Sequence, residues 1–137
     1  MVRKAEFDDT IFILAAIHLI AAGGPHAATM TAIAQQANAP TGSIYHRFPS
    51  RTALLGAAWH FALQDMATAL LPALQQGDSE QAVIARCLWS EQNPEFARVI
   101  MLYDENDLIA GPIPDKLGKA IGRVNRSLGA GLTALLT

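Results

Sequence analysis

The sequence has a single cysteine, no internal repeat and no useful stretch of strand-like alternation between polar and apolar residues. Cys87 is alone among 137 residues, which excludes an internal disulfide and favours a reducing compartment. We expect it to be a small, buried apolar side chain. Without a strand pattern, helices must build the core of a chain that is 51% hydrophobic and has segments rich in alanine and leucine. The predicted fold class is therefore all-α.

Positive charge is also scarce. The net charge is −2, and this alone argues against a protein that binds nucleic acid. The distribution of charge points the other way, because residues 10–64 contain no aspartate or glutamate and hold Arg47, Arg51 and all four histidines. A surface without carboxylates can approach phosphates without repulsion, although its attraction for them is modest.

The most apolar stretch, residues 11–22, is shorter than the roughly 20 residues that a bilayer requires. Two basic residues precede it, as in a secretory signal, but Glu6, Asp8 and Asp9 stand where such a signal carries no acid. We therefore expect a buried helix in a cytoplasmic protein that has no membrane partner.

Capping residues and apolar periodicity divide the chain into predicted helices. Their ranges are about 10–22, 29–37, 40–48, 51–71, 79–90, 94–103 and 116–136. The second and third helices are so close in sequence that they must cross steeply, as in a helix-turn-helix. Pro72 is expected to interrupt the fourth helix, and "ENDLIAGPIPD", residues 105–115, is expected to be a loop.

The third predicted helix, within "APTGSIYHRFPSR", has two different faces. On a helical wheel, Ile44 and Phe48 lie together and should form its buried edge. Gly42, Ser43 and His46 fall on the opposite side, where a solvent-facing helix would usually carry Glu, Lys or Gln. Such small groups let a helix backbone approach a flat polar surface closely, and the DNA major groove has room for a helix.

Groups suited to phosphates surround this face. Thr29 begins the second helix, where backbone N–H groups are free to meet an anion. Tyr45 carries a phenol at the rim, and Thr31 and Thr41 are further short donors. Arg51 lies in the first turn of the fourth helix, where a positive charge opposes the helix dipole. A bound phosphate would explain that position.

Residues 10–59 resemble the DNA-binding domain of TetR-family transcriptional regulators. The likeness is carried by "TMTAIAQQA", "TGSIYHRF" and "PSRTALL", which follow a glycine-terminated first helix in that order at the family spacing. The resemblance implies a three-helix head, residues 1–52, whose third helix enters the major groove. A long fourth helix would join this head to a small helical body for effector binding and dimerisation, residues 53–137.

On the matching positions, the resemblance implies contacts with DNA, mainly with its phosphates. The implied contact residues are Thr29, Thr41, Tyr45, His46 and Arg51. Gly42 would allow close approach, and Ser43 and His46 would lie nearest the base edges. His46 would either donate to guanine N7 or O6 or contact a phosphate.

Three positions depart from the family pattern. Pro40 replaces the usual capping serine, Asn38 the common turn glycine, and Thr41 a frequent basic residue. Together they predict weaker electrostatic binding to DNA than is usual. The outer positions of the first helix form an apolar strip that another part of the chain could cover: Leu14, His18 and Ala22.

The body is expected to hold an apolar effector, although each of its large side chains can also be ordinary core. The candidate pocket residues are Trp59, His60, Met66, Trp89, Phe96, Met101 and Tyr103. No metal or cofactor is expected, because His60 lacks a second ligand at helical spacing and the acidic residues 104–107 resemble a solvated corner. No nucleophile has a recognisable base partner, so we do not expect an enzyme.

The sequence thus predicts a transcriptional regulator that binds double-stranded DNA as a homodimer on a pseudo-palindromic operator, and a repressor role that a small apolar effector relieves. The competing interpretation is a helical small-molecule-binding or interaction protein with a degenerate head. From the resemblance we expect the body to be truncated relative to family bodies, with the helices that usually form the dimer interface shortened or absent. Four glycines in residues 116–136 would let another helix pack closely.

Overall fold

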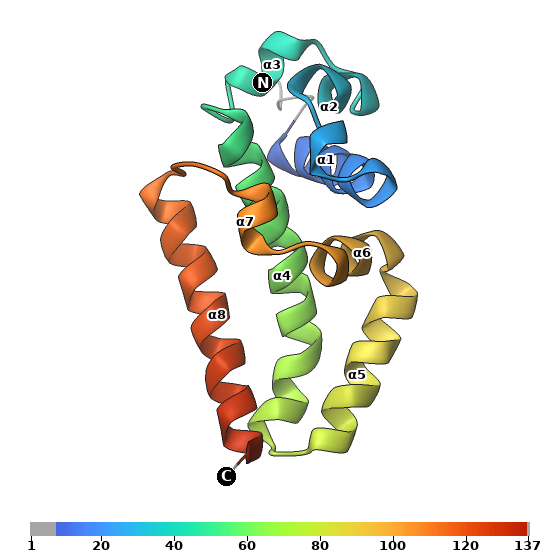
Figure 1. Cartoon of the computed structure of the whole chain (residues 1–137), viewed down its shortest axis with the longest axis vertical. Helices are drawn as coiled ribbons and strands as arrows, with labels where there is room; N and C mark the ends of the chain where they lie inside the picture. The colour runs from blue at the N-terminus through green and yellow to red at the C-terminus, as the bar shows by residue number, and fades with distance from the viewer. Residues whose placement is uncertain (1–7, 137) are drawn as a thin grey trace, which may run out of the picture.

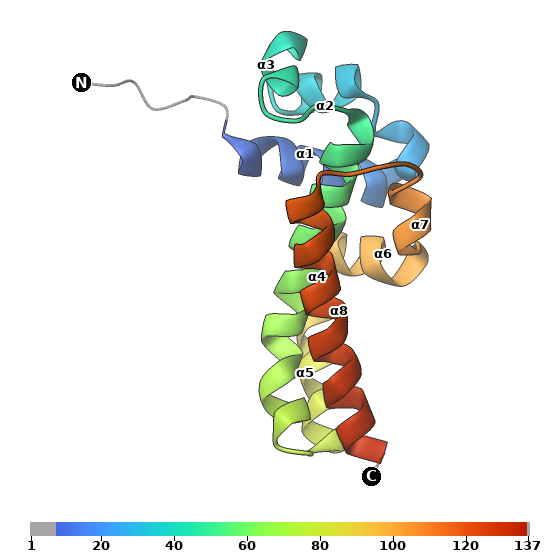
Figure 2. The same cartoon turned by 90° about the vertical axis from the view of Figure 1, so that its left-hand side faces the viewer.

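The computed structural model describes residues 8–136, which form an elongated helical molecule (Figures 1 and 2). Its elements are α1 (Asp9–Gly23), the 3₁₀ turn η1 (Pro25–Ala27), α2 (Met30–Gln36), α3 (Thr41–Tyr45), α4 (Arg51–Gln75), α5 (Ser79–Gln92), α6 (Pro94–Leu102), α7 (Glu105–Leu108) and α8 (Asp115–Leu136). Residues 8–136 contain no strand, and the all-α prediction is confirmed. The charged residues before position 8 that entered the argument against a secretory signal lie outside the described residues.

α1 begins at an aspartate cap and is buried along one side. The Asp8 side chain accepts a hydrogen bond from the Ile11 N–H at 3.2 Å, which satisfies one free donor of the first turn. Phe12 and Ile17 are fully buried against neighbouring helices. Gly24 follows the helix with a φ of 90°, a conformation that favours glycine. In the part of the chain that the structure describes, no helix is long and apolar enough to cross a membrane.

The turn between α2 and α3 has the capping chemistry that the sequence predicts. Thr29 caps α2 by accepting from the Ala32 N–H at 3.1 Å. Asn38 takes a φ of 55°, and its N–H and the following one bond to carbonyls of the last turn at 3.1 and 2.9 Å. These two bonds close the end of α2 as a left-handed glycine would. α3 can therefore start after a very short turn, although it ends earlier than predicted, at Tyr45.

α4 is longer than the sequence predicts. Ser50 caps it as expected, accepting an N–H of the first turn at 3.1 Å. The expectation that Pro72 interrupts the helix is wrong, because Pro72 lies inside α4 and the helix continues almost to Gly77. A proline costs one helical hydrogen bond, and here only the last turn follows it. Leu70 and Leu74, on either side of the proline, are buried in the core and hold that turn in place.

In the body, α5 and α8 pack on two sides of α4, and α6 packs on α1 (Figure 1). Gly131 brings α8 very close to α4, because a Cβ on this residue would lie 2.9 Å from the Leu74 Cβ. Gly131 therefore allows α8 to pack closely against α4 of the same chain.

Residues 105–115, predicted as a loop, contain one helical turn, α7. The Asp107 side chain accepts from the Asp104 N–H at 2.7 Å, which is one of the two bonds of a capping box. Two of the acids that formed the predicted solvated corner therefore lie at the start of this turn and stabilise it.

Candidate nucleic-acid interface

Two apolar side chains hold α3 against the head. Ile44 is fully buried and Phe48 is 7% exposed, as the helical wheel predicted. Pro40 precedes the helix with extended backbone and supplies no side-chain cap. The N–H groups of Arg47 and Phe48 both bond to the Ile44 carbonyl at 2.9 Å, so the chain turns tightly after α3. α3 is thus a short, fixed helix at the end of the molecule opposite the far ends of α5 and α8 (Figure 2).

The side of α3 that faces away from Ile44 is open. Gly42 and His46 are exposed, and a Cβ on Gly42 would meet nothing within 4 Å. Packing among the described residues does not require glycine here, although glycine in a helix is about 1 kcal/mol less favourable than alanine. A surface that approaches from outside would explain it, and a DNA groove is such a surface. Thr41 and Tyr45 are also exposed at this end.

Ser43 is placed differently from what we expected. It is half-buried, and its hydroxyl donates to the Pro40 carbonyl at 2.6 Å. The hydrogen of this hydroxyl is therefore used within the head, and only the oxygen lone pairs can accept from a base. The His46 side chain makes no hydrogen bond with another residue in the range 8–136, so its ring is the better candidate for reading a base edge.

Thr29 and Thr31 are exposed at the start of α2, which packs against α3. The Thr29 oxygen accepts the capping bond from Ala32, and its hydroxyl hydrogen remains to donate to a phosphate. The two threonines therefore lie on the surface of a helix that packs against α3.

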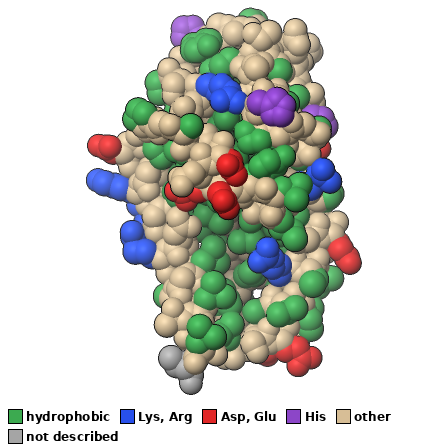
Figure 3. All heavy atoms as spheres, viewed as in Figure 1, with side chains coloured by type: hydrophobic (Ala, Val, Ile, Leu, Met, Phe, Trp, Pro, Cys, Tyr) green, Lys and Arg blue, Asp and Glu red, His purple; other side chains and the backbone are tan. Residues whose placement is uncertain are grey.

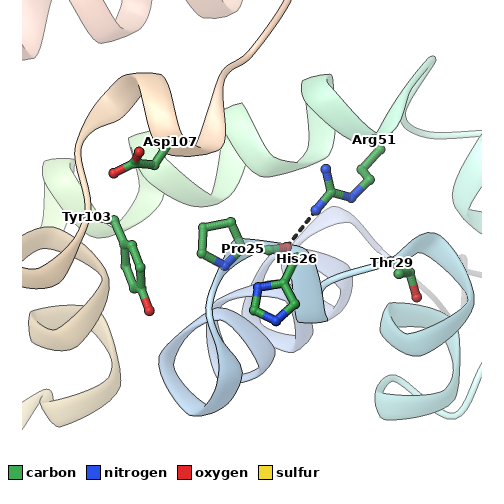
Figure 4. Close-up of a pocket in the computed structure, with 6 residues that line it drawn as sticks. All are labelled: Pro25, His26, Thr29, Arg51, Tyr103 and Asp107. Atoms are coloured by element: carbon green, nitrogen blue, oxygen red, sulfur yellow. Dashed lines mark hydrogen bonds between the residues drawn. The ribbon is translucent and has the colours of Figure 1, made fainter.

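Arg51 has partners inside the chain. Its Nε donates to the Ala28 carbonyl at 2.8 Å, and its Nη2 donates to the Pro25 carbonyl at 2.5 Å (Figure 4). These bonds fasten the start of α4 to the turn between α1 and α2. They explain a positive charge in the first turn of α4 without a phosphate, so the predicted phosphate contact loses the argument that motivated it.

Arg47 also has a partner in the chain. Its Nη1 lies 3.2 Å from Oδ1 of Asp9 at the start of α1. Both arginines of the acid-free segment are thus engaged in the head. This arrangement agrees with the weak electrostatic binding that the sequence predicts.

The seven predicted pocket residues do not line one cavity. Three of them are buried core residues: Trp59, Met66 and Trp89. Phe96 packs edge-on against Phe61, with ring centroids 5.8 Å apart. Different cavities are lined by His60, Met101 and Tyr103. These side chains leave their helices in different directions, so the seven candidates do not share one cavity.

A cavity of about 520 Å³ lies between α4, α5 and α8, and we call it the apolar groove. Its lining residues are Leu70, Leu74, Ser79, Ala82, Val83, Arg86, Cys87, Ser90, Met101, Leu132 and Leu135. Figure 3 shows hydrophobic side chains gathered around a hollow between α5 and α8. Cys87 is exposed in its wall, so the prediction that this thiol is buried is wrong. One side of α5 packs on α4, whereas Cys87 lies on the side that is exposed in the groove.

His60 lies on α4 and lines a smaller cavity together with Arg123 of α8. Burial and, to a lesser extent, the charge of Arg123 lower the pKa of His60 below its ordinary value. The neutral imidazole is therefore favoured in the folded chain. Within residues 8–136, no group of three or more His, Cys, Asp or Glu side chains is placed to hold a metal ion.

Two polar contacts join the body to α1, and sequence reasoning missed both. Arg98 Nε donates to the Ala21 carbonyl at 3.0 Å, and His18 Nδ1 lies 2.5 Å from Glu95 Oε2. Arg98 and Glu95 belong to α6, and helical spacing alone could not have shown what that helix packs against. The predicted strip on α1 is covered only in part, since Leu14 remains 42% exposed.

A helix-turn-helix whose second helix lies open on one side is the arrangement of a DNA-binding head. Residues 12–58, which include α2, α3 and the start of α4, match the family model of bacterial regulatory proteins of the tetR family. The crystal structure of a Shewanella sp. PV-4 protein, described as a TetR family transcription regulator, has a similar fold. Its TM-score is 0.65 at 23% identity, and the match covers 92% of this chain and 70% of that chain. No curated protein matches the sequence. Residues 12–58 are therefore the DNA-binding head of a TetR-family regulator.

Proposed function

We propose that this regulator is a cytoplasmic repressor that binds a pseudo-palindromic operator as a homodimer and is released by a small effector. The exposed face of α3 supports the proposal most, because Gly42 and His46 stand outward over the buried Ile44. A dimer would place two such helices in successive major grooves, roughly 34–36 Å apart. Thr29, Thr31, Thr41 and Tyr45 would contact the flanking phosphates.

The apolar groove is the effector site in this proposal. Met101 at its edge belongs to α6, and α6 is bonded to α1 through Arg98. An occupant that displaces Met101 would therefore move the helix that contacts the head. To change operator occupancy from nearly full to nearly empty, the effector must favour one state by about 10⁴-fold.

A salt titration of binding to duplex DNA tests the proposal. For a regulator that contacts phosphates, the logarithm of the affinity falls linearly with the logarithm of the salt concentration, and the slope reports the number of contacts. We expect a measurable but shallow slope, because Arg47 and Arg51 already have partners in the chain.

The engagement of the same two arginines favours a second candidate, a helical small-molecule-binding protein whose head no longer binds DNA. This candidate predicts no binding at about 50 mM salt, where electrostatic contacts to DNA are strong. The low-salt end of the titration therefore separates the two functions.

A further inference from the structure

The apolar groove exposes large hydrophobic side chains on two helices. Its floor is α4, with Leu70 and Leu74, and its walls are α5 and α8. Val83 on α5 is 63% exposed and Leu132 on α8 is 54% exposed. Removal of apolar surface from water is favourable, so an apolar occupant of this groove would be stabilised. Exposed apolar patches of this kind commonly mark binding sites.

Arg86 is the charged residue of the groove. The other polar side chains in the lining are two serine hydroxyls and the Cys87 thiol, and the lining contains no carboxylate. The Arg86 side chain makes no hydrogen bond or ion pair with any other residue between 8 and 136. Its guanidinium is therefore available, and a guanidinium can bind a carboxylate through two parallel hydrogen bonds.

We propose that the apolar groove binds a single-chain amphipathic anion of the fatty-acid class. The carboxylate pairs with Arg86, and the alkyl chain lies along Leu70, Leu74 and Leu132. The volume of about 520 Å³ is within the range of small-molecule sites. A cation would be repelled by Arg86, and a neutral apolar chain would leave the guanidinium unpaired. The inference rests on the proposed function for its regulatory meaning, because it names the chemical class of the effector.

Titration calorimetry on the full chain, without DNA, tests the binding itself. The probes are dodecanoate, 1-dodecanol and dodecyltrimethylammonium, which share one chain length and differ in charge, each below its aggregation concentration. We expect saturable binding of one dodecanoate per chain, and binding of the other two that is at least about tenfold weaker, because the charged pair is lost. Equal affinities for all three probes, or binding of none, would overturn the proposal.

Variants locate the contact. R86Q should weaken dodecanoate binding about tenfold or more and leave dodecanol binding unchanged, whereas R86K should keep most of the affinity. R126Q is the matched control, because Arg126 is an exposed arginine of α8 outside the groove lining. L132Q should weaken both dodecanoate and dodecanol. Thermal unfolding of each variant verifies that it is folded. Wild-type dodecanoate affinity in R86Q would overturn the assignment.

A second copy of the chain is the competing occupant of the groove. Sedimentation equilibrium distinguishes a dimer from a ligand complex. If the chain forms a dimer that L132Q disrupts, and dodecanoate does not dissociate this dimer, the ligand proposal is overturned. The proposed function has a separate readout. If dodecanoate binds and the DNA affinity does not change, the groove is a binding site for this ligand class but is not the effector site. A chain that binds dodecanoate and no DNA would contradict only the proposed function.

Discussion

Arg98 of α6 donates from Nε to the carbonyl of Ala21, 3.0 Å away, near the C-terminal end of α1. The guanidinium thus lies where the α1 dipole is negative, which favours a cation. This bond connects a helix at the edge of the apolar groove to a helix of the DNA-binding head. It is one route by which an occupant of the groove can affect the head.

Replacement of Arg98 tests that route. In R98Q, we expect DNA affinity without effector to stay within about threefold of wild type, and the change in affinity on adding effector to be largely lost. The free energy of unfolding should fall by about 1 kcal/mol, the typical net value of one hydrogen bond. Fluorescence anisotropy with and without dodecanoate measures the first effect, and urea unfolding the second. A full effector response in R98Q would remove α6 from the route.

Replacement of Gly42 should change folding stability and DNA affinity in opposite directions. G42A should stabilise the free protein by up to about 1 kcal/mol, because a Cβ at this position meets no described atom within 4 Å and alanine favours helix. The same Cβ should hinder approach to DNA and lower affinity about tenfold or more. Urea unfolding and anisotropy are the measurements. Wild-type DNA affinity in G42A would show that α3 does not approach DNA through this residue.

Arg51 is expected to matter for stability. R51Q should lower the free energy of unfolding by about 1.5–3 kcal/mol, because the half-buried guanidinium donates to two backbone carbonyls. R47Q is the matched control. Its pairing with the exposed Asp9 should contribute less than about 1 kcal/mol. Equal, small losses in both variants would contradict the bracing role of Arg51.

Two glycines of α8 form a matched pair. G129A should stabilise the chain by up to about 1 kcal/mol, because a Cβ on Gly129 would meet nothing within 4 Å. G131A should be less stable than G129A by about 1–3 kcal/mol, because its Cβ would lie 2.9 Å from the Leu74 Cβ and force α8 away from α4. Thermal and urea unfolding measure both. Equal stabilisation by the two substitutions would contradict the close packing of α8 on α4.

The lowered pKa of His60 leads us to expect a loss of folding stability in acid. Its pKa in the folded chain is lowered by burial and then by Arg123, so the unfolded chain binds a proton more readily. The stability that the folded chain retains because His60 is neutral is fully present above the ordinary histidine pKa of about 6.5. It is lost as the pH falls from there through the lowered pKa. Unfolding at pH 7.5 and pH 5.5 should show a smaller loss in H60Q than in the wild type. The same loss in both would exclude His60 as a source.

The head was largely predictable from the sequence, because its signals are local. Thr29, Asn38 and Ser50 cap or terminate helices through bonds to residues only a few positions away. The burial of Ile44 and Phe48 follows from helical periodicity alone. A single sequence contains all of this information.

Features that depend on distant partners were not predictable. Arg51 bonds to carbonyls that lie more than twenty positions earlier in the chain. α4 continues past Pro72 because Leu70 and Leu74 are packed by other helices. Cys87 is exposed, and the predicted pocket residues are scattered, because only some sides of α4, α5 and α6 pack against another helix. Periodicity shows that a helix has an apolar side, but it does not show which helix covers that side.

Selection of bound duplexes from a random pool tests most directly the claim that the open face of α3 reads DNA. We predict enrichment of a pseudo-palindrome whose half-sites are centred one helical turn apart, about 10–10.5 base pairs, or a multiple of it. The same selection with H46A should change the preferred base at one symmetric pair of positions. A pool without enrichment at low salt, or an identical consensus with H46A, would contradict the account.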